Sequence, residues 1–215
     1  MPRVALIHAT PVAVDPIKGA FALGWPEADT AHILDESLTA DRARTPELTP
    51  EMFARFELLV RYARHIGSSG VLFTCSAFGE AIERAAKAVD IPVLKPNEAM
   101  FDAALALGDR IGMVATFAPA VAGMEEEFKQ AAKQHRSSAR LETIVAHGAM
   151  PALRAGDEAE HNRLVAEAAG SLDCDAIMLA HFSTSRALTA SKEASRHPIL
   201  TSPEAAVAKM RSMVR

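Results

Sequence analysis

The fold is decided by Gly70-Val71-Leu72-Phe73-Thr74-Cys75-Ser76-Ala77-Phe78-Gly79-Glu80. An apolar run stops abruptly at Thr-Cys-Ser and passes directly into Glu80–Lys87, whose composition favours a helix. This pattern predicts a buried strand that feeds a helix. We therefore expect Cys75 at the carboxyl end of a strand.

Such a position is a candidate functional site. Ligands of open α/β sheets bind at the carboxyl ends of the strands, and the following helix start presents free N–H groups and a positive dipole end. This setting predicts that the thiolate of Cys75 is favoured relative to a free cysteine, whose pKa is about 8.5. The alternative is that Cys75 is a small buried residue without a chemical role.

Composition narrows the class of protein. The chain has 215 residues, enough for one domain or two of about 100 residues each. Its net charge of −4 and its 23% of charged residues indicate no basic surface that would bind nucleic acid. The partner that we expect is a small molecule that is neutral or mildly anionic. The sequence shows no apolar run of about 18 residues and no signal-peptide pattern, so we expect a cytoplasmic protein with no membrane partner.

The two cysteines, Cys75 and Cys174, are too few for a disulfide framework and lack metal-type spacing. Cys174 precedes a predicted strand, at the end opposite the expected site, and is interpreted as structural or incidental. The histidines show no metal spacing either, so no metal site is predicted. His8 alone ends a predicted strand at the expected site, and packing or solvent exposure is favoured for it.

Strands and helices alternate along the chain. Thr49 and Pro50 form a helix start, and the helix should end near Gly67, whereas Asp15–Glu47 gives little signal beyond one possible strand. Further helices are expected from Asn97 to Leu107, from the residues after Pro119 to about Gln134, over residues 156–169, and from Pro203 onward. The strands are expected at residues 4–7, 31–34, 70–74, 91–94, 110–115, 141–145, 176–179 and 198–200. Alternation of this kind indicates a parallel α/β architecture.

The two halves of the sequence resemble each other at an offset of 106 or 107 residues, by subtraction of residue numbers. The matching segments are Arg3–Ile7 with Arg110–Val114, Val71–Cys75 with Ile177–His181, and Ile91–Leu94 with His197–Leu200. Cys75 and His181 are therefore equivalent positions. If the halves are related by a pseudo-twofold axis, these strand ends can converge on one cleft.

The sequence resembles the aspartate/glutamate racemase superfamily, which includes hydantoin racemases, maleate isomerases and arylmalonate decarboxylases. The resemblance is carried by Thr74–Ala77 after an apolar strand, by Asp175–Leu179 with its polar exit, and by the duplicated layout. It implies two pseudo-symmetric, flavodoxin-like α/β halves with a cofactor-independent active site in the cleft between them. The expected halves are 1–96 plus 201–215, closed by the C-terminal helix, and 97–200. A homodimer or larger homo-oligomer is also implied.

The implied chemistry is removal of a proton beside a carboxylate or carbonyl by a cysteine, with a second residue returning one on the opposite face. Such a reaction requires a base and donors for the developing negative charge, which helix starts can supply. The expected ligands of a small-molecule carboxylate substrate are Thr10, Ser76, Ala77, Thr116, Ser183, Thr184 and Ser185. Arg186 could also steer an anion, although a solvated helix surface is favoured for it.

The sequence departs from the superfamily at the second catalytic position. Racemases of this kind usually carry cysteine in both halves, but here the position is His181, or Ala180 if the alignment slips by one residue. His181 could act as an acid–base partner with an ordinary pKa near 6.5, bind the substrate carboxylate only, or make a local hydrogen bond at a strand end.

Three functions follow. The first is a racemase or isomerase that acts through Cys75 at the α-carbon of a small carboxylic acid, amino acid or related compound. The second is a decarboxylase of the arylmalonate type that uses one cysteine. The third is a binding protein for small carboxylates that has no catalytic activity.

Overall fold

The computed structural model describes residues 1–45 and 47–214, and the chain divides into two compact units. Unit 1 contains Met1–Pro96 and Ala206–Arg215, and unit 2 contains Asn97–Ala205. The second boundary lies inside helix α10 (Ser202–Met213), whereas the sequence placed it at residue 201, before that helix. Arg215, the last residue of the predicted range, and Pro46 lie outside the described residues.

Unit 1 is built on a parallel sheet with strand order β2-β1-β3-β4. In the register of the sheet, Ile7 lies opposite Phe73 and His8 lies opposite Leu34. The carboxyl ends of β1 and β3 are therefore neighbours. The four strands are β1 (Arg3–His8), β2 (Asp29–Leu34), β3 (Gly70–Phe73) and β4 (Val93–Leu94).

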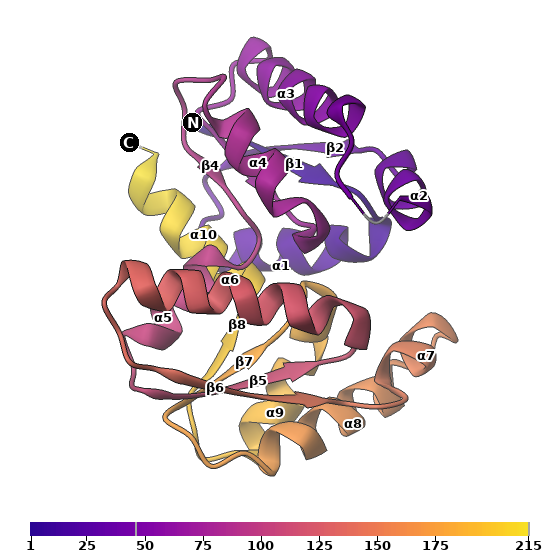
Figure 1. Ribbon diagram of the computed structural model, residues 1–215, viewed down its shortest axis with the longest axis vertical. Helices are drawn as coiled ribbons and strands as arrows, with labels where there is room; N and C mark the ends of the chain where they lie inside the picture. The colour runs from indigo at the N-terminus through magenta and orange to yellow at the C-terminus, as the bar shows by residue number, and fades with distance from the viewer. Residues whose placement is uncertain (46, 215) are drawn as a thin grey trace. The chain divides into compact units, whose positions relative to one another are not determined.

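Helices cover both faces of this sheet (Figure 1). Val71 and Phe73 belong to a core with α3 and α4, whereas Gly70, on the opposite face, lies against Met210 of α10. The helical elements are η1 (Pro11–Ala13), α1 (Val14–Gly24), α2 (Ser37–Arg44), α3 (Pro50–His65), η2 (Ser76–Phe78) and α4 (Gly79–Ala86), together with α10.

Helix α3 begins as the sequence predicts. Pro50 occupies the first turn, and Thr49 Oγ1 accepts a hydrogen bond of 3.4 Å from the N–H of Met52. This bond satisfies one of the free N–H groups at the helix start. Phe56 and Val60 then project from α3 into the core at helical spacing.

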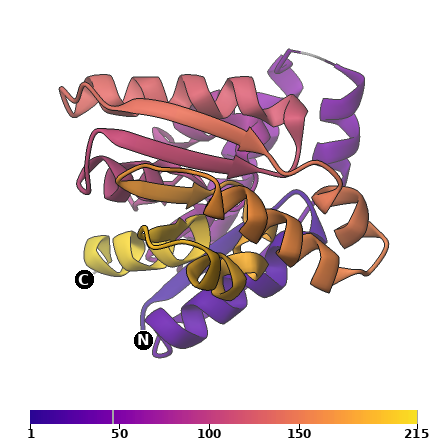
Figure 2. The ribbon, with the colours of Figure 1, turned by 90° about the horizontal axis from the view of Figure 1, so that it is seen from below.

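Unit 2 repeats the topology of unit 1, with strand order β6-β5-β7-β8 and all strands parallel. Figure 2 shows β5, β6 and β7 running side by side in the same direction. Strand β7 therefore occupies the place that β3 has in unit 1. The strands are β5 (Arg110–Ala115), β6 (Arg140–Val145), β7 (Ala176–Leu179) and β8 (Ile199–Thr201).

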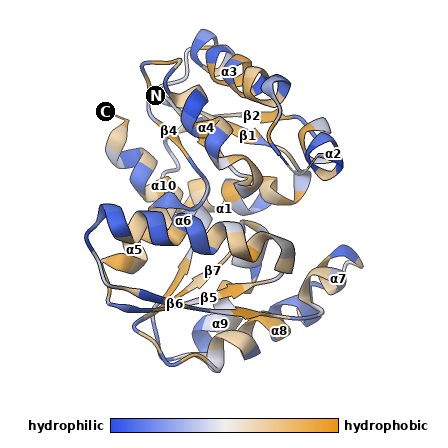
Figure 3. Ribbon diagram, viewed as in Figure 1, coloured by the Kyte–Doolittle hydropathy of each residue, from blue (hydrophilic) through white to orange (hydrophobic). Residues whose placement is uncertain are grey.

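Two apolar layers enclose the second sheet. Met113 and Met178 pack against α5 and α6, whereas Val114 and Leu179 belong to a core with α8. The strands β5 and β7 are accordingly among the apolar segments in Figure 3. The helical elements are α5 (Glu98–Leu105), η3 (Ala118–Ala120), α6 (Val121–Gln134), α7 (Ala149–Arg154), α8 (Glu158–Gly170), η4 (Ser183–Ala187) and α9 (Leu188–Ala194).

The α/β fold with two parallel sheets confirms the predicted fold class. Three helices, α1, α2 and α7, were not predicted. Their N-caps, Ala13, Glu36 and Gly148, make no side-chain capping bond, so the usual start signal is missing. Helix α8 begins after Asp157, whose side chain caps it, and not at residue 156. Within the described part of the chain, no helix is long and apolar enough to cross a membrane.

Candidate functional site

Cys75 lies two residues beyond β3, in extended backbone, at the N-cap position of η2. The residue is partly exposed. Burial of its thiol raises the pKa, and a hydrogen bond from the backbone of Ala77 lowers it by less, so the net shift is upward. The prediction of a favoured thiolate is therefore wrong for this environment, because loss of hydration outweighs one N–H donor.

Three phenylalanines support the turn that carries Cys75. The ring of Phe56, from α3, lies 5.2 Å between centroids from Phe73 and 4.9 Å from Phe78. Phe73 ends β3 and Phe78 ends η2, so the two residues bracket Cys75 in the sequence. All three rings are buried, and their packing anchors the turn on both sides of the cysteine.

A histidine that the sequence gave no role is part of the same strand-end region. His8, at the end of β1, is completely buried, and its Nδ1 lies 2.9 Å from Thr74 Oγ1. Its Nε2 lies 2.9 Å from Nδ1 of His32 on β2. Burial, together with the charges of His32 and Lys18, lowers the pKa of His8 to about 4. Its place at a strand end was visible in the sequence, but its partners depend on strand pairing.

The remaining predicted residues of unit 1 lie at the same end of the sheet. Thr10 follows β1 and is partly exposed, and its side chain makes no capping bond to η1. Ser76 is partly exposed and Ala77 exposed. The carbonyl of Ala77 accepts a hydrogen bond of 3.3 Å from Nε of Arg42 on α2.

His181 stands in unit 2 where Cys75 stands in unit 1, two residues beyond β7. Its φ of 69° is left-handed, which is uncommon for a residue with a side chain and stores local strain. Burial lowers the pKa of its imidazole to about 4. Its Nε2 is buried and has no hydrogen-bond partner among the described residues, so a local hydrogen bond at this atom does not explain the residue.

Hydroxyl groups gather at the neighbouring strand ends of unit 2. Thr116, after β5, and Thr184, in η4, place their Oγ1 atoms 3.4 Å apart. Both are buried, as is Ser183. Ser185 is used locally, because its Oγ donates to the carbonyl of Phe182 at 2.7 Å. The structure thus brings Thr116 and Thr184 together.

Arg186 continues η4, and the Nη1 atom of its guanidinium lies 3.4 Å from Glu158 Oε2. Its Nε is buried without a partner in the described part of the chain. The side chain is 24% exposed, so it is not the solvated residue that the sequence favoured.

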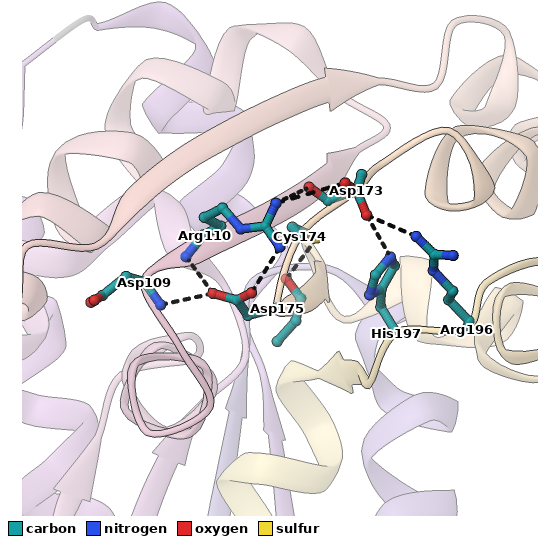
Figure 4. Close-up of polar contacts among 8 residues, drawn as sticks. Asp109, Arg110, Asp173, Cys174, Asp175, Arg196 and His197 are labelled. Atoms are coloured by element: carbon teal, nitrogen blue, oxygen red, sulfur yellow. Dashed lines mark hydrogen bonds and ion pairs between the residues drawn. The ribbon is translucent and has the colours of Figure 1, made fainter.

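Cys174 belongs to a different cluster, at the amino ends of β5 and β7 (Figure 4). Asp175 there accepts hydrogen bonds from the N–H groups of Asp109 and Arg110, at 3.0 and 2.9 Å. The Arg110 guanidinium contacts the same carboxylate at 3.1 Å. Cys174 is buried and its thiol donates to the carbonyl of Ala176. These contacts join two strand starts and lie at the end of the sheet away from His181.

No group of three or more His, Cys, Asp or Glu residues in the described ranges is arranged to hold a metal ion. Beyond β3 and β7 the two units present Cys75 and His181, each near hydroxyl groups and the start of a helical segment. Such groups can transfer a proton and bind a carboxylate.

The Asp/Glu/Hydantoin racemase family model matches residues 33–172. No curated protein matches the sequence. Among solved structures, an allantoin racemase from Klebsiella pneumoniae is similar, with a TM-score of 0.73 and 20% identity over 100% of this chain and 88% of the other. The aspartate racemase of Picrophilus torridus gives a TM-score of 0.74 and 13% identity over 99% and 94%. A glutamate racemase from Bacillus anthracis gives 0.71 and 13% over 98% and 80%.

Proposed function

Because this chain belongs to the Asp/Glu/Hydantoin racemase family, we propose that it is a racemase or isomerase acting at the α-carbon of a small carboxylic acid, an amino acid or a related compound. The observation that carries the proposal is the equivalence of Cys75 and His181. Each is an acid–base side chain, and each stands two residues beyond the equivalent strand of its unit. The reaction as proposed needs no cofactor.

The resting protonation states of the two groups suit opposite roles. Near pH 7 the raised pKa of Cys75 keeps a thiol, and the lowered pKa of His181 keeps a neutral imidazole. In one direction, His181 Nε2 takes the α-proton and the Cys75 thiol gives its proton to the resulting carbanion. The products are imidazolium and thiolate, and transfer of one proton through solvent restores the starting forms. The other direction starts from the thiolate–imidazolium pair, which one proton transfer through solvent forms from the resting groups: the Cys75 thiolate takes the α-proton, and the His181 imidazolium gives its proton to the carbanion.

The hydroxyl groups at the strand ends are assigned to substrate binding. We propose that Thr116, Ser183 and Thr184 bind its carboxylate, with Thr10, Ser76 and the backbone of Ala77 as donors on the side of unit 1. Charge-assisted hydrogen bonds of this kind stabilise the negative charge that develops on the carboxylate oxygens.

Exchange of the α-proton tests the assignment. Candidate acids are incubated with the protein in heavy water, and loss of the α-proton signal is followed by NMR. We expect racemisation with exchange for the wild type and for Cys174→Ser. Cys75→Ser should lose racemisation, and it should lose exchange for the enantiomer whose α-proton Cys75 removes. Racemisation that persists in Cys75→Ser would overturn the role of Cys75. Activity that is lost on dialysis against a chelator and restored by a metal ion would contradict cofactor independence.

A lyase is the second candidate, and it is favoured by the single cysteine at these strand ends. Decarboxylation of a malonate-type acid creates a carbanion without a base and needs only one proton donor, which a protonated Cys75 can be. Release of carbon dioxide from an arylmalonate, with deuterium incorporated once per turnover, would support it. Racemisation without release of carbon dioxide would exclude it.

A further inference from the structure

The side chains of three residues are linked by hydrogen bonds in the order His32, His8 and Thr74. This chain of hydrogen bonds begins at the protein surface with His32 and ends at Thr74, the residue before Cys75. His32 is exposed, whereas His8 and Thr74 are buried. The two imidazole planes are inclined by 9° and their centroids lie 5.2 Å apart. With 2.9 Å between the facing nitrogens, the rings meet edge to edge, which is the geometry of a good hydrogen bond.

The contact of His8 with Thr74 lies one residue beyond the last pair of β1 with β3. The register of β1 with β3 ends at Ile7 opposite Phe73, and one further bond of 3.0 Å runs from the N–H of Thr74 to the carbonyl of Ile7. The contact of Thr74 Oγ1 with His8 is then the last hydrogen bond from β1 to this segment among the described residues. Cys75 follows immediately.

We propose that His8 is a positioning residue for Cys75. His8 acts through Thr74, and its own position is held by the hydrogen bond to His32. The inference rests on the proposed function, because it explains how the reactive thiol is kept in place. A catalytic group displaced by about 1 Å can lose about 100-fold in rate. A buried side-chain bond next to Cys75 limits such displacement.

The two bonds of His8 are coupled. A neutral imidazole has one N–H donor and one acceptor nitrogen, so the direction of the bond to His32 sets whether His8 Nδ1 donates to Thr74 or accepts from it. Lys18 on α1 also acts on His8 and disfavours a positive charge there. When the exposed His32 is protonated, its Nδ1 donates, and His8 must then donate to Thr74. The Thr74 hydroxyl can then donate to the carbonyl of Ile7, which lies 3.4 Å from Thr74 Oγ1, so the state of a surface histidine is transmitted to the residue before Cys75.

Labelling of Cys75 with iodoacetamide tests the inference and needs no substrate. The variants are His8→Leu, Thr74→Val and the double variant, with Thr74→Ser retaining the hydroxyl and His65→Ala as a matched control on α3. Labelling is measured against pH by peptide mass spectrometry, with buried Cys174 as an internal reporter of unfolding. Fluorescence of Trp25, the only tryptophan, reports the folding of unit 1.

We expect His8→Leu and Thr74→Val to speed the labelling of Cys75 at pH 7 and to lower its midpoint pH, because a loosened turn admits water to the thiol. The effects of the two changes should sum to more than the effect of the double variant, since both break the contact of His8 with Thr74, and Thr74→Val also removes the 3.4 Å bond from Thr74 Oγ1 to the carbonyl of Ile7. Thr74→Ser and His65→Ala should behave as wild type. Where a substrate is turned over, kcat should fall by about 10-fold or more with little change in KM.

An unchanged labelling profile in the two single variants, or additive effects in the double variant, would overturn the inference. If His8→Leu does not fold, Thr74→Val and His32→Ala carry the same test, and wild-type labelling in both would overturn it. Absence of turnover on every acid would count against the proposed function, and the labelling would still decide the role of His8.

Discussion

The Oγ1 atoms of Thr116 and Thr184 lie 3.4 Å apart, at the neighbouring carboxyl ends of β5 and β7. Thr184→Val removes one hydroxyl and keeps the shape of the side chain. We expect KM to rise about 10-fold with a smaller change in kcat, the size of one lost hydrogen bond to a charged group. Steady-state kinetics measure this, with Thr143→Val on β6 as the control, since its hydroxyl lacks a partner among the described residues. An equal rise of KM in both variants would contradict the role of Thr184.

His181 holds a left-handed backbone that glycine adopts without strain. His181→Gly should therefore be more stable than His181→Ala by about 1 kcal/mol, while both variants lose turnover. Urea unfolding and the rate of racemisation measure the two effects. Arg136→Gly is the matched control, because Arg136 also has a positive φ, and it should gain stability and keep turnover. Equal stability of the two variants at position 181 would argue against strain.

The buried imidazole of His8 predicts how unit 1 responds to acid. Its pKa is lowered from 6.5 to about 4, chiefly by burial, so the unfolded chain takes up this proton first as the pH falls. The contribution of His8 to the free energy of unfolding should be constant above about pH 7.5 and decline between pH 6.5 and 4, by about 3 kcal/mol. Urea unfolding followed by Trp25 fluorescence measures the decline. In His8→Asn the decline should be smaller, and an identical decline would assign it to other groups.

Asp175 links the starts of β5 and β7. The hydrogen bond from the backbone N–H of Arg110 is the main cause that lowers the pKa of the Asp175 carboxyl group. Asp175→Asn should lower the thermal midpoint and leave α-proton exchange unchanged, because the carboxylate lies at the end of the sheet away from His181. The difference in midpoint should shrink as the pH falls, since protonation of the wild-type carboxyl removes the same contacts. Asp173→Asn, at a carboxylate 69% exposed, is the milder control. A lost exchange activity would instead place Asp175 in the catalytic machinery.

The sequence was sufficient to predict the strand that ends before Cys75, because a four-residue apolar run followed directly by polar residues is a local signal. The repeat was equally accessible, and the identical strand orders of the two sheets agree with it. The capped start of α3 also follows from local side-chain chemistry.

The chemistry of the strand ends could not be predicted in the same way. The pKa of Cys75 depends on how much water reaches the thiol, and this is set by the turn that Phe56 packs from a distant helix. The contact of His8 with Thr74 joins residues 66 positions apart, and only the pairing of β1 with β3 creates it. The left-handed backbone of His181 could not be predicted, because the position is not occupied by glycine or asparagine, the residues that usually adopt this conformation.

The discontinuity of unit 1 has a consequence for biosynthesis. Ala206, Val207 and Met210 are buried and belong to unit 1, although they are translated after the whole of unit 2. Met210 lies against Gly70 of β3, so the emerging first sheet lacks part of its cover until residue 210 has left the ribosome. Unit 2 is continuous in sequence and complete earlier. Nascent chains truncated before residue 206 should therefore leave the Cys75 sheet exposed to chaperones while unit 2 is already folded.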